Sequence, residues 1–237
     1  MSELIEVSDL NADDLVVEIG SGKGIITEAL RRKVREVIAI EKDEKLAMES
    51  NAICADILKY ELPKMPYKIF SNIPFSITSE IMAHIMQSVV LPESMYLIMQ
   101  KETAEKFEGK PAETLSSILT KPWYEVETLG EIDRTSFTLK PQIKIVFAKF
   151  TKRKMAFIKD EDKNDFRDFV TYGFSQWKPT VVEAYKKVFT FAQMDHVKKM
   201  LKIGEEAPGK LSFDKWLLLF KTFQKIANYE QRKLVRH

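Results

Sequence analysis

Residues 15–24 read Leu15-Val-Val-Glu18-Ile-Gly20-Ser-Gly22-Lys-Gly24, a hydrophobic stretch followed by three alternating glycines. The stretch from Leu15 to Ile19 is largely apolar on both faces, which predicts a buried central strand of a parallel sheet. The glycines allow the backbone to turn tightly against a ligand, and residues 25–32 have the apolar spacing of a helix. A strand, a glycine turn and a helix in this order predict a ligand-binding edge of an α/β sheet.

Three nucleotide-binding patterns compete for this turn. A Walker A loop needs Gly-Lys followed by Ser or Thr, whereas Lys23 precedes a glycine here, and a dinucleotide fingerprint needs a glycine where Ile25 stands. The remaining pattern, Glu-x-Gly-x-Gly-x-Gly, is that of S-adenosylmethionine (SAM) methyltransferases, and a glycine turn without a ligand is the alternative. If the pattern holds, five residues of the loop contact the cofactor: Glu18, Gly20, Ser21, Gly22 and Gly24.

Composition narrows the class of protein. The chain has 237 residues, 45% of them hydrophobic, which is enough for an ordinary globular core. No apolar run approaches the roughly 20 residues that span a bilayer, and the acidic start lacks the basic segment of a signal peptide. The single cysteine, Cys54, has no disulfide partner and no metal-ligand spacing. We therefore expect a cytoplasmic protein with no metal and no membrane segment.

Charge is distributed unevenly along the chain. Residues 1–139 contain 15 Lys/Arg and 24 Asp/Glu, whereas residues 140–237 contain 22 Lys/Arg and 11 Asp/Glu. A basic second part favours a polyanionic partner, with nucleic acid as the first candidate, unless the lysines only solvate helix faces. We expect RNA contacts from a hinge and from a lysine pair in the helical tail: Lys152, Arg153, Lys154, Lys186 and Lys187.

Acidic residues follow the next two predicted strands. Glu41 closes the apolar segment 36–40, about twenty residues after the glycine turn, where a carboxylate can accept hydrogen bonds from both ribose hydroxyls of a nucleoside. Asp56 ends a brief strand and could accept from the adenine amino group. Lys42 and Ile57, their neighbours, and Asn72 after the fourth predicted strand complete the expected cofactor site, and a solvated strand-end glutamate is the alternative for Glu41.

A fourth predicted strand, residues 67–71, leads into Asn72-Ile73-Pro74-Phe75. The exocyclic amine of adenine is a poor nucleophile because its lone pair is delocalised into the ring. The side-chain carbonyl of Asn72 and the backbone carbonyl of Ile73 can hold its two N–H groups and draw the lone pair toward a methyl donor. Pro74 stiffens the turn by fixing φ, and Phe75 offers a stacking face for a base taken out of its helix.

The rest of the chain predicts a β-hairpin and a helical tail. Residues 124–132 and 143–150 have strand patterns, and Phe137 between them could cover a flipped base opposite Phe75 or serve as a buried plug. Residues 108–122 are less apolar and predict a loop. Helical patterns cover 164–177, 181–188, 193–201 and 213–229. The expected architecture is a domain over 1–151 with a mostly parallel sheet and terminal hairpin, and a small all-α domain over 152–237.

With these residues in place, the chain resembles the rRNA adenine N6-methyltransferase family, and in particular its Erm branch. The stretches that carry the resemblance are Glu18–Gly24, Ile40–Asp43, Ala55–Leu58, Lys68–Phe75, Ser136–Phe137 with Pro141, Tyr185–Thr190 and Leu211–Leu217. It implies a Rossmann-like SAM-dependent catalytic domain, a helical RNA-binding domain and a monomer that methylates N6 of an adenine in 23S rRNA, with macrolide, lincosamide and streptogramin B resistance as the consequence.

The resemblance also implies a role for each matching residue. Gly20 lies against the cofactor, Glu41 takes the ribose, Asp56 takes the adenine amine and Asn72 polarises the target amine, with Phe75 and Phe137 on either side of the base. Asp56 follows Glu41 by only 15 positions, a shorter connection than the family's usual helix and strand occupy. A DNA adenine methyltransferase and a non-catalytic RNA-binding protein of the same fold remain alternatives.

Overall fold

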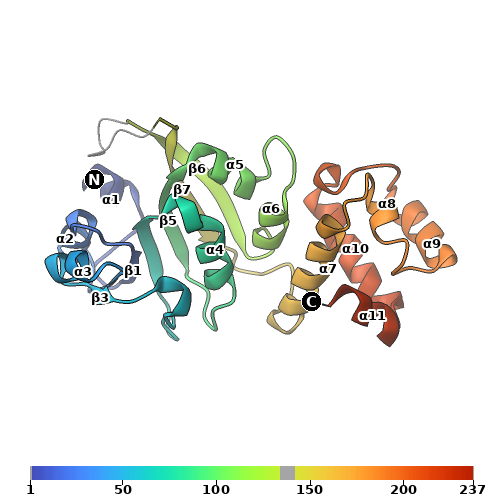
Figure 1. The fold of residues 1–237 in the computed structure, drawn as a ribbon, viewed down its shortest axis with the longest axis horizontal. Helices are drawn as coiled ribbons and strands as arrows, with labels where there is room; N and C mark the ends of the chain where they lie inside the picture. The colour runs from blue at the N-terminus through green and yellow to red at the C-terminus, as the bar shows by residue number, and fades with distance from the viewer. Residues whose placement is uncertain (1, 134–141, 237) are drawn as a thin grey trace. The chain divides into compact units, whose positions relative to one another are not determined.

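The computed structural model describes residues 2–133 and 142–236 (Figure 1). These residues form two compact units. The first contains the described residues of 1–104 and 124–152, and the second contains 105–123 together with the described residues from 153 onward.

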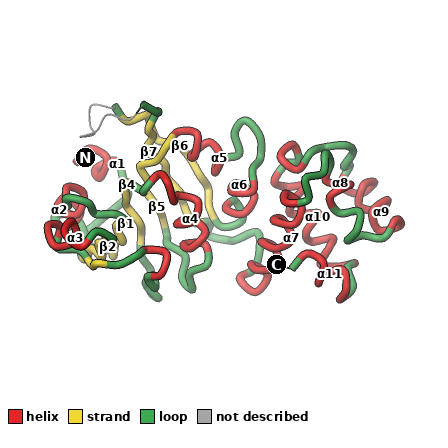
Figure 2. Tube along the Cα trace, viewed as in Figure 1, coloured by secondary structure: helices red, strands yellow, loops and turns green. Residues whose placement is uncertain are grey.

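The first unit is built on one seven-stranded sheet with strand order β3-β2-β1-β4-β5-β7-β6. Strands are drawn in yellow in Figure 2. Five strands are parallel: β1 (Leu15–Ile19), β2 (Glu36–Glu41), β3 (Ile53–Cys54), β4 (Lys68–Asn72) and β5 (Ser94–Gln100). The terminal hairpin of β6 (Tyr124–Ile132) and β7 (Ile145–Lys152) adds to β5, with β7 antiparallel to both neighbours. The expected Rossmann-like sheet with a terminal hairpin is therefore confirmed.

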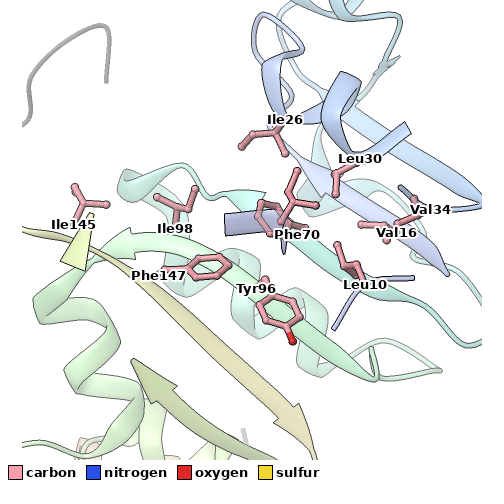
Figure 3. Packing of buried hydrophobic residues seen from close by; sticks show 11 residues of the cluster. Leu10, Val16, Ile26, Leu30, Val34, Phe70, Tyr96, Ile98, Ile145 and Phe147 are labelled. Carbon is pink, nitrogen blue, oxygen red and sulfur yellow. The ribbon is translucent and has the colours of Figure 1, made fainter. Parts of the chain in front are cut away.

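Five helices accompany the sheet along the chain: α1 (Ser2–Val7), α2 (Ile25–Arg31), α3 (Glu44–Ser50), α4 (Thr78–Met86) and α5 (Lys101–Glu108), the last of which runs across the division between the units. Side chains from α1 and α2 pack with alternate residues of the strands in one buried cluster. Val16, Phe70 and Tyr96 are its members from β1, β4 and β5 (Figure 3). Because successive strand residues point to opposite faces, this cluster fixes the register of the central strands.

The second unit is helical. Its elements are α6 (Leu115–Thr120), α7 (Lys163–Ser175), α8 (Val181–Ala184), α9 (Phe191–Leu201), α10 (Phe213–Ile226) and α11 (Tyr229–Val235). Aromatic rings fill its core, with Phe169 of α7 packed on Tyr185, Trp216 and Phe223 at centroid distances of 4.6, 6.4 and 4.7 Å. Such offset and edge-on pairs add to the stabilisation from burial.

The division of the chain differs from the expected one in a single segment. The boundary between Lys152 and Arg153 lies one residue from the expected position, but residues 105–123 belong to the helical unit. The loop predicted over 108–122 contains α6, which begins with a capping box between Thr114 and Ser117. Trp123 is buried after it, with its ring 6.1 Å from that of Phe166 in α7.

Two helix predictions in the tail are wrong in extent. The helix predicted over 181–188 ends at Ala184, because Tyr185 turns inward and donates its hydroxyl hydrogen to the Phe169 carbonyl at 2.6 Å. The helix predicted over 213–229 ends at Ile226, and a helix that was not predicted, α11, begins at Tyr229, where Asn228 caps it through a reciprocal hydrogen-bond pair with Gln231.

Candidate active site

All three glycines of the loop after β1 adopt left-handed backbone angles, with φ of 75° at Gly20, 53° at Gly22 and 79° at Gly24. A Cβ at Gly24 would lie 3.0 Å from Cβ of Ser50 in α3, and one at Gly20 would lie 3.4 Å from Cγ of Pro74. A Cβ at Gly22 would meet no described atom within 4 Å. Two glycines therefore allow close packing of the loop, and the third leaves open space where a ligand can approach the backbone.

Hydrogen bonds hold this loop against its neighbours. The Gly20 N–H donates to the Ile40 carbonyl of β2 at 2.8 Å. The hydroxyls of Ser21 and Ser50 lie 2.8 Å apart and form a buried hydrogen bond. The loop is consequently fixed to β2 and α3 before any ligand binds.

The carboxylate of Glu41 accepts three hydrogen bonds from nearby backbone N–H groups. Its Oε2 accepts from the Gly22 N–H at 2.9 Å, and its Oε1 accepts from the N–H groups of Lys42 and Asp43 at 2.7 and 2.9 Å. A carboxylate offers about four lone-pair sites, so about one is left for a further donor. With this network intact, Glu41 can accept one ribose hydroxyl, and a second would displace a backbone donor.

Asp56 lies beside Glu41 at the edge of the sheet, since the Ala55 N–H donates to the Glu41 carbonyl at 2.9 Å. Its Oδ2 is 3.0 Å from Nζ of Lys42, and its Oδ1 accepts from the Leu58 N–H at 3.1 Å. The hydrogen bond from Lys42 is the main reason that the pKa of Asp56 lies below its usual value. Asp56 is therefore a charged hydrogen-bond acceptor, and its Oδ2 is already paired with Lys42.

The short connection between the two acids is sufficient to place them together. It consists of the seven-residue helix α3, which Asp43 caps, and the two-residue strand β3. Ile57 follows Asp56 as a buried residue and begins a single 3₁₀ turn. The 15 steps from Glu41 to Asp56 thus suffice to return the chain to the carboxyl edge of the sheet.

Glu18 lies under α2 at the end of β1 and is 1% exposed. Thr27 donates its hydroxyl hydrogen to Oε2 at 2.5 Å, and Oε1 has no hydrogen-bond partner among the described residues. Burial raises the pKa of Glu18 from 4.5 to about 7, so the carboxyl is partly protonated near neutral pH. Its direct contact with a cofactor stays a prediction.

The turn after β4 lies against the glycine loop through the contact between Pro74 and Gly20. Oδ1 of Asn72 is buried and, within the part of the chain described, has no hydrogen-bond partner. Ile73 is buried and donates its N–H to the Ile98 carbonyl of β5 at 3.2 Å. Phe75 is partly buried against the hydrophobic cluster of the sheet. An unpaired amide oxygen beside a cofactor-type loop is suited to accept an N–H of a substrate.

The remaining predicted residues are not part of this edge, and Phe137 lies outside the described residues. Lys152, Lys154, Lys186 and Lys187 are exposed, the last two in the turn between α8 and α9 rather than on a helix. Arg153 is engaged locally, since its Nε donates to the Lys121 carbonyl at 2.9 Å and its guanidinium lies 4.8 Å from the Phe157 ring centroid.

Sequence reasoning missed three features of the site. Ser50 forms a hydrogen bond with Ser21, and Thr27 forms one with Glu18. Lys42 forms an ion pair with Asp56. No local sequence pattern identifies the residues that form these three interactions. They become neighbours of the loop only through the packing of α3 and α2 and the pairing of β2 with β3.

The donors and acceptors at this edge of the sheet fit SAM. Three features match the nucleoside part of SAM. Gly22 leaves open space, Glu41 can accept one more hydrogen bond, and Asp56 offers a carboxylate acceptor at the edge of the sheet. The described residues contain no group of three or more His, Cys, Asp or Glu side chains able to hold a metal ion. In the same residues no helix is both long and apolar enough to cross a membrane.

Five parallel strands with a reversed terminal hairpin, and a glycine turn after the central strand, define the class of SAM-dependent methyltransferases. The particular family follows from comparison with known proteins: the chain belongs to the ribosomal RNA adenine dimethylase family, whose model matches residues 1–225. It is thus a SAM-dependent rRNA adenine N6-methyltransferase, and the expected enzyme class, cofactor and RNA substrate are confirmed.

Relatives and solved structures agree with this family over most of the chain. The chain is 29% identical to an rRNA adenine N-6-methyltransferase of Bacillus licheniformis over 94% of its length and 82% of that protein's. It is 27% identical to a ribosomal RNA small subunit methyltransferase A of Latilactobacillus sakei, over 76% and 68% of the two chains. Its fold is similar to that of the 23S rRNA methyltransferase ErmE, with a TM-score of 0.78, 22% identity and coverage of 94% and 96%.

Proposed function

We propose that this enzyme methylates N6 of an adenine in 23S rRNA and thereby confers macrolide, lincosamide and streptogramin B resistance. Support comes from sequence identity, which is 29% with the Bacillus licheniformis rRNA adenine N-6-methyltransferase and 25–28% with small-subunit methyltransferase A relatives. The solved structure with a similar fold over nearly the whole chain is described as a 23S rRNA methyltransferase. The sheet unit would then be the catalytic domain and the helical unit the RNA-binding domain of a cytoplasmic monomer.

The observation that carries the catalytic proposal is the unpaired, buried Oδ1 of Asn72, two residues before the proline that contacts Gly20. SAM supplies an electrophilic methyl group on a positively charged sulfur. Asn72 Oδ1 accepts one N–H of the target amine, the Ile73 carbonyl accepts the other, and the lone pair of N6 becomes available for attack. In the transfer, N6 would form the new bond to carbon as the C–S bond breaks with its electrons on sulfur, and the proton lost from N6 would pass to solvent water.

Phe75 has the second role in this proposal. Its partly buried ring is fixed by the hydrophobic cluster beneath it and follows directly after Pro74. An aromatic face in this position can stack on an adenine that has been turned out of its RNA helix. Phe137 is proposed as the opposite cover of the base.

A methylation assay with three nucleic acids tests the proposal. Protein-free 23S rRNA, 16S rRNA and duplex DNA are each incubated with the enzyme and methyl-labelled SAM, and the modified adenine is mapped. We expect labelling of 23S rRNA at N6 of adenine. Activity on DNA alone would refute the assignment, and activity on 16S rRNA alone would select the second candidate.

The second candidate is methylation of small-subunit rRNA, which is favoured by the name of the Latilactobacillus sakei relative. A matched control separates either activity from simple RNA binding. Asn72→Ala should lower the methylation rate by about a hundredfold or more while calorimetry shows nearly unchanged SAM affinity, because only the hold on the amine is lost. An equal loss of SAM affinity would place Asn72 in cofactor binding instead.

A further inference from the structure

Helix α9 of the helical unit packs through one face, and its other faces are exposed to solvent. Only Val197 and Leu201 of its eleven residues are buried. It is nevertheless fixed in place, since Gln193 Nε2 donates to the Ile226 carbonyl at the end of α10 at 2.8 Å and Lys215 Nζ donates to the Lys202 carbonyl at 2.8 Å. These contacts hold both ends of the helix against α10.

The exposed face of α9 combines one aromatic ring with cations. Phe191, Asp195 and Lys198 recur at intervals of four and three residues and so share one face of α9, and the exposed Lys202 follows as the C-cap, about 16 Å along the axis from Phe191. Phe191 is 92% exposed at the first position of the helix, and it contributes little to the core. Asp195 pairs with Lys199 at 2.8 Å, whereas Lys198 and Lys202 have no ion-pair partner in the described part of the chain.

Charge identifies the kind of partner. Residues 153–236 contain 18 Lys/Arg against 11 Asp/Glu, so the surface favours a polyanion. A rigid aromatic ring in line with two cations about 6 Å apart along the helix matches a strand of nucleic acid, in which bases offer π faces and phosphates offer negative charge.

We infer that the α9 stripe, defined as Phe191, Lys198 and Lys202, is an RNA-docking surface that stacks on an unpaired base of the rRNA and contacts the phosphates beside it. The inference rests on the proposed function, because it requires an rRNA substrate. It adds a binding surface remote in sequence from Asn72 and Glu41, on residues that take no part in methyl transfer.

The salt dependence of RNA binding separates the two kinds of contact. The full-length protein is titrated with fragments of 23S and 16S rRNA at several salt concentrations, and variants are compared on the RNA that the wild type binds. Phe191→Ala should lose about tenfold in affinity with an unchanged salt slope, because stacking releases no counterions, and Phe191→Tyr should keep the affinity. Lys198→Gln/Lys202→Gln should flatten the log-log slope by about 1.4, or about 0.7 for each single-stranded contact.

A charge-matched control lies on α10. Lys221→Gln/Lys225→Gln removes two exposed lysines at the same four-residue spacing and should leave the slope unchanged. Melting temperature and SAM affinity should be equal in all variants, since Phe191 and the four lysines are exposed. Equal effects of both lysine pairs on the salt slope, or an unchanged RNA affinity of Phe191→Ala, would refute the inference that RNA docks on the α9 stripe. A wild type that binds neither rRNA would instead overturn the proposed function.

Discussion

The buried carboxyl of Glu18 should make the stability of this protein fall as the pH rises from about 4.5 to 7. Its pKa is about 7 in the folded protein against an ordinary 4.5, so the folded state holds a proton that the unfolded state has released within this interval. Below 4.5 both states are protonated and the contribution of Glu18 is complete; above 7 both are ionised and the contribution is lost. At about 1.4 kcal/mol for each pKa unit, the difference is about 3 kcal/mol.

The measurement is the free energy of unfolding in urea, without cofactor, at several pH values from 5 to 8. Glu18→Gln keeps the shape of the side chain and its acceptor for the Thr27 hydroxyl, and it cannot ionise. The stability of wild type minus that of Glu18→Gln should therefore decrease by about 3 kcal/mol across the interval, with other titrating groups cancelling. Glu36→Gln, a change at an exposed position of β2, is the charge control and should show a flat difference. Parallel curves for wild type and Glu18→Gln would refute the reasoning.

Three further changes test the site. Gly24→Ala and Gly22→Ala each place a side chain on a left-handed backbone at a cost of about 1 to 2 kcal/mol, but only Gly24→Ala must also displace α3, so its loss of unfolding free energy should be larger; equal losses would contradict the packing. Phe75→Leu should cost about 1 to 3 kcal/mol in the use of RNA, seen as a lower kcat/KM for rRNA, whereas Phe75→Tyr should be tolerated; equal damage from both would exclude stacking as its role. Lys42→Gln should raise the pKa of Asp56 toward its usual value in an NMR titration, because the hydrogen bond that lowers it is removed; an unmoved pKa would mean that the ion pair does not form in solution.

The sheet was predictable because its strands are apolar runs that end in polar residues. Tyr124–Ile132 matches its predicted bounds, and β2 differs by one residue. The helices α6 and α11 were missed because they are only six and seven residues long, so that their caps are the stronger signal. Thr114 with Ser117 and Asn228 with Gln231 are separated by three residues in each case, a spacing visible in the sequence.

The candidate site was predictable in its positions and much less so in its interactions. Strand order alone brings the residues after β1, β2, β3 and β4 to one edge, so Gly20, Glu41, Asp56 and Asn72 follow from four separate motifs. The three hydrogen bonds that the Glu41 carboxylate accepts from backbone N–H groups could not be predicted from the sequence, because they depend on the backbone angles of the folded loop. The pairing of Lys42 with Asp56 likewise needs the register of β2 with β3.

The chain enters the helical unit twice, and this has a consequence for biosynthesis and for dissecting the enzyme. Residues 105–123 are made before β6 and β7, yet they pack with helices that are made after residue 153. Ile118 and Trp123 are buried where α6 packs on α7, with the Trp123 ring against that of Phe166. A nascent chain that has emerged only to residue 152 therefore exposes two large apolar side chains to solvent. A fragment that ends at residue 152 would expose the same apolar surface. The sheet unit can be isolated cleanly only if residues 105–123 are replaced by a polar linker.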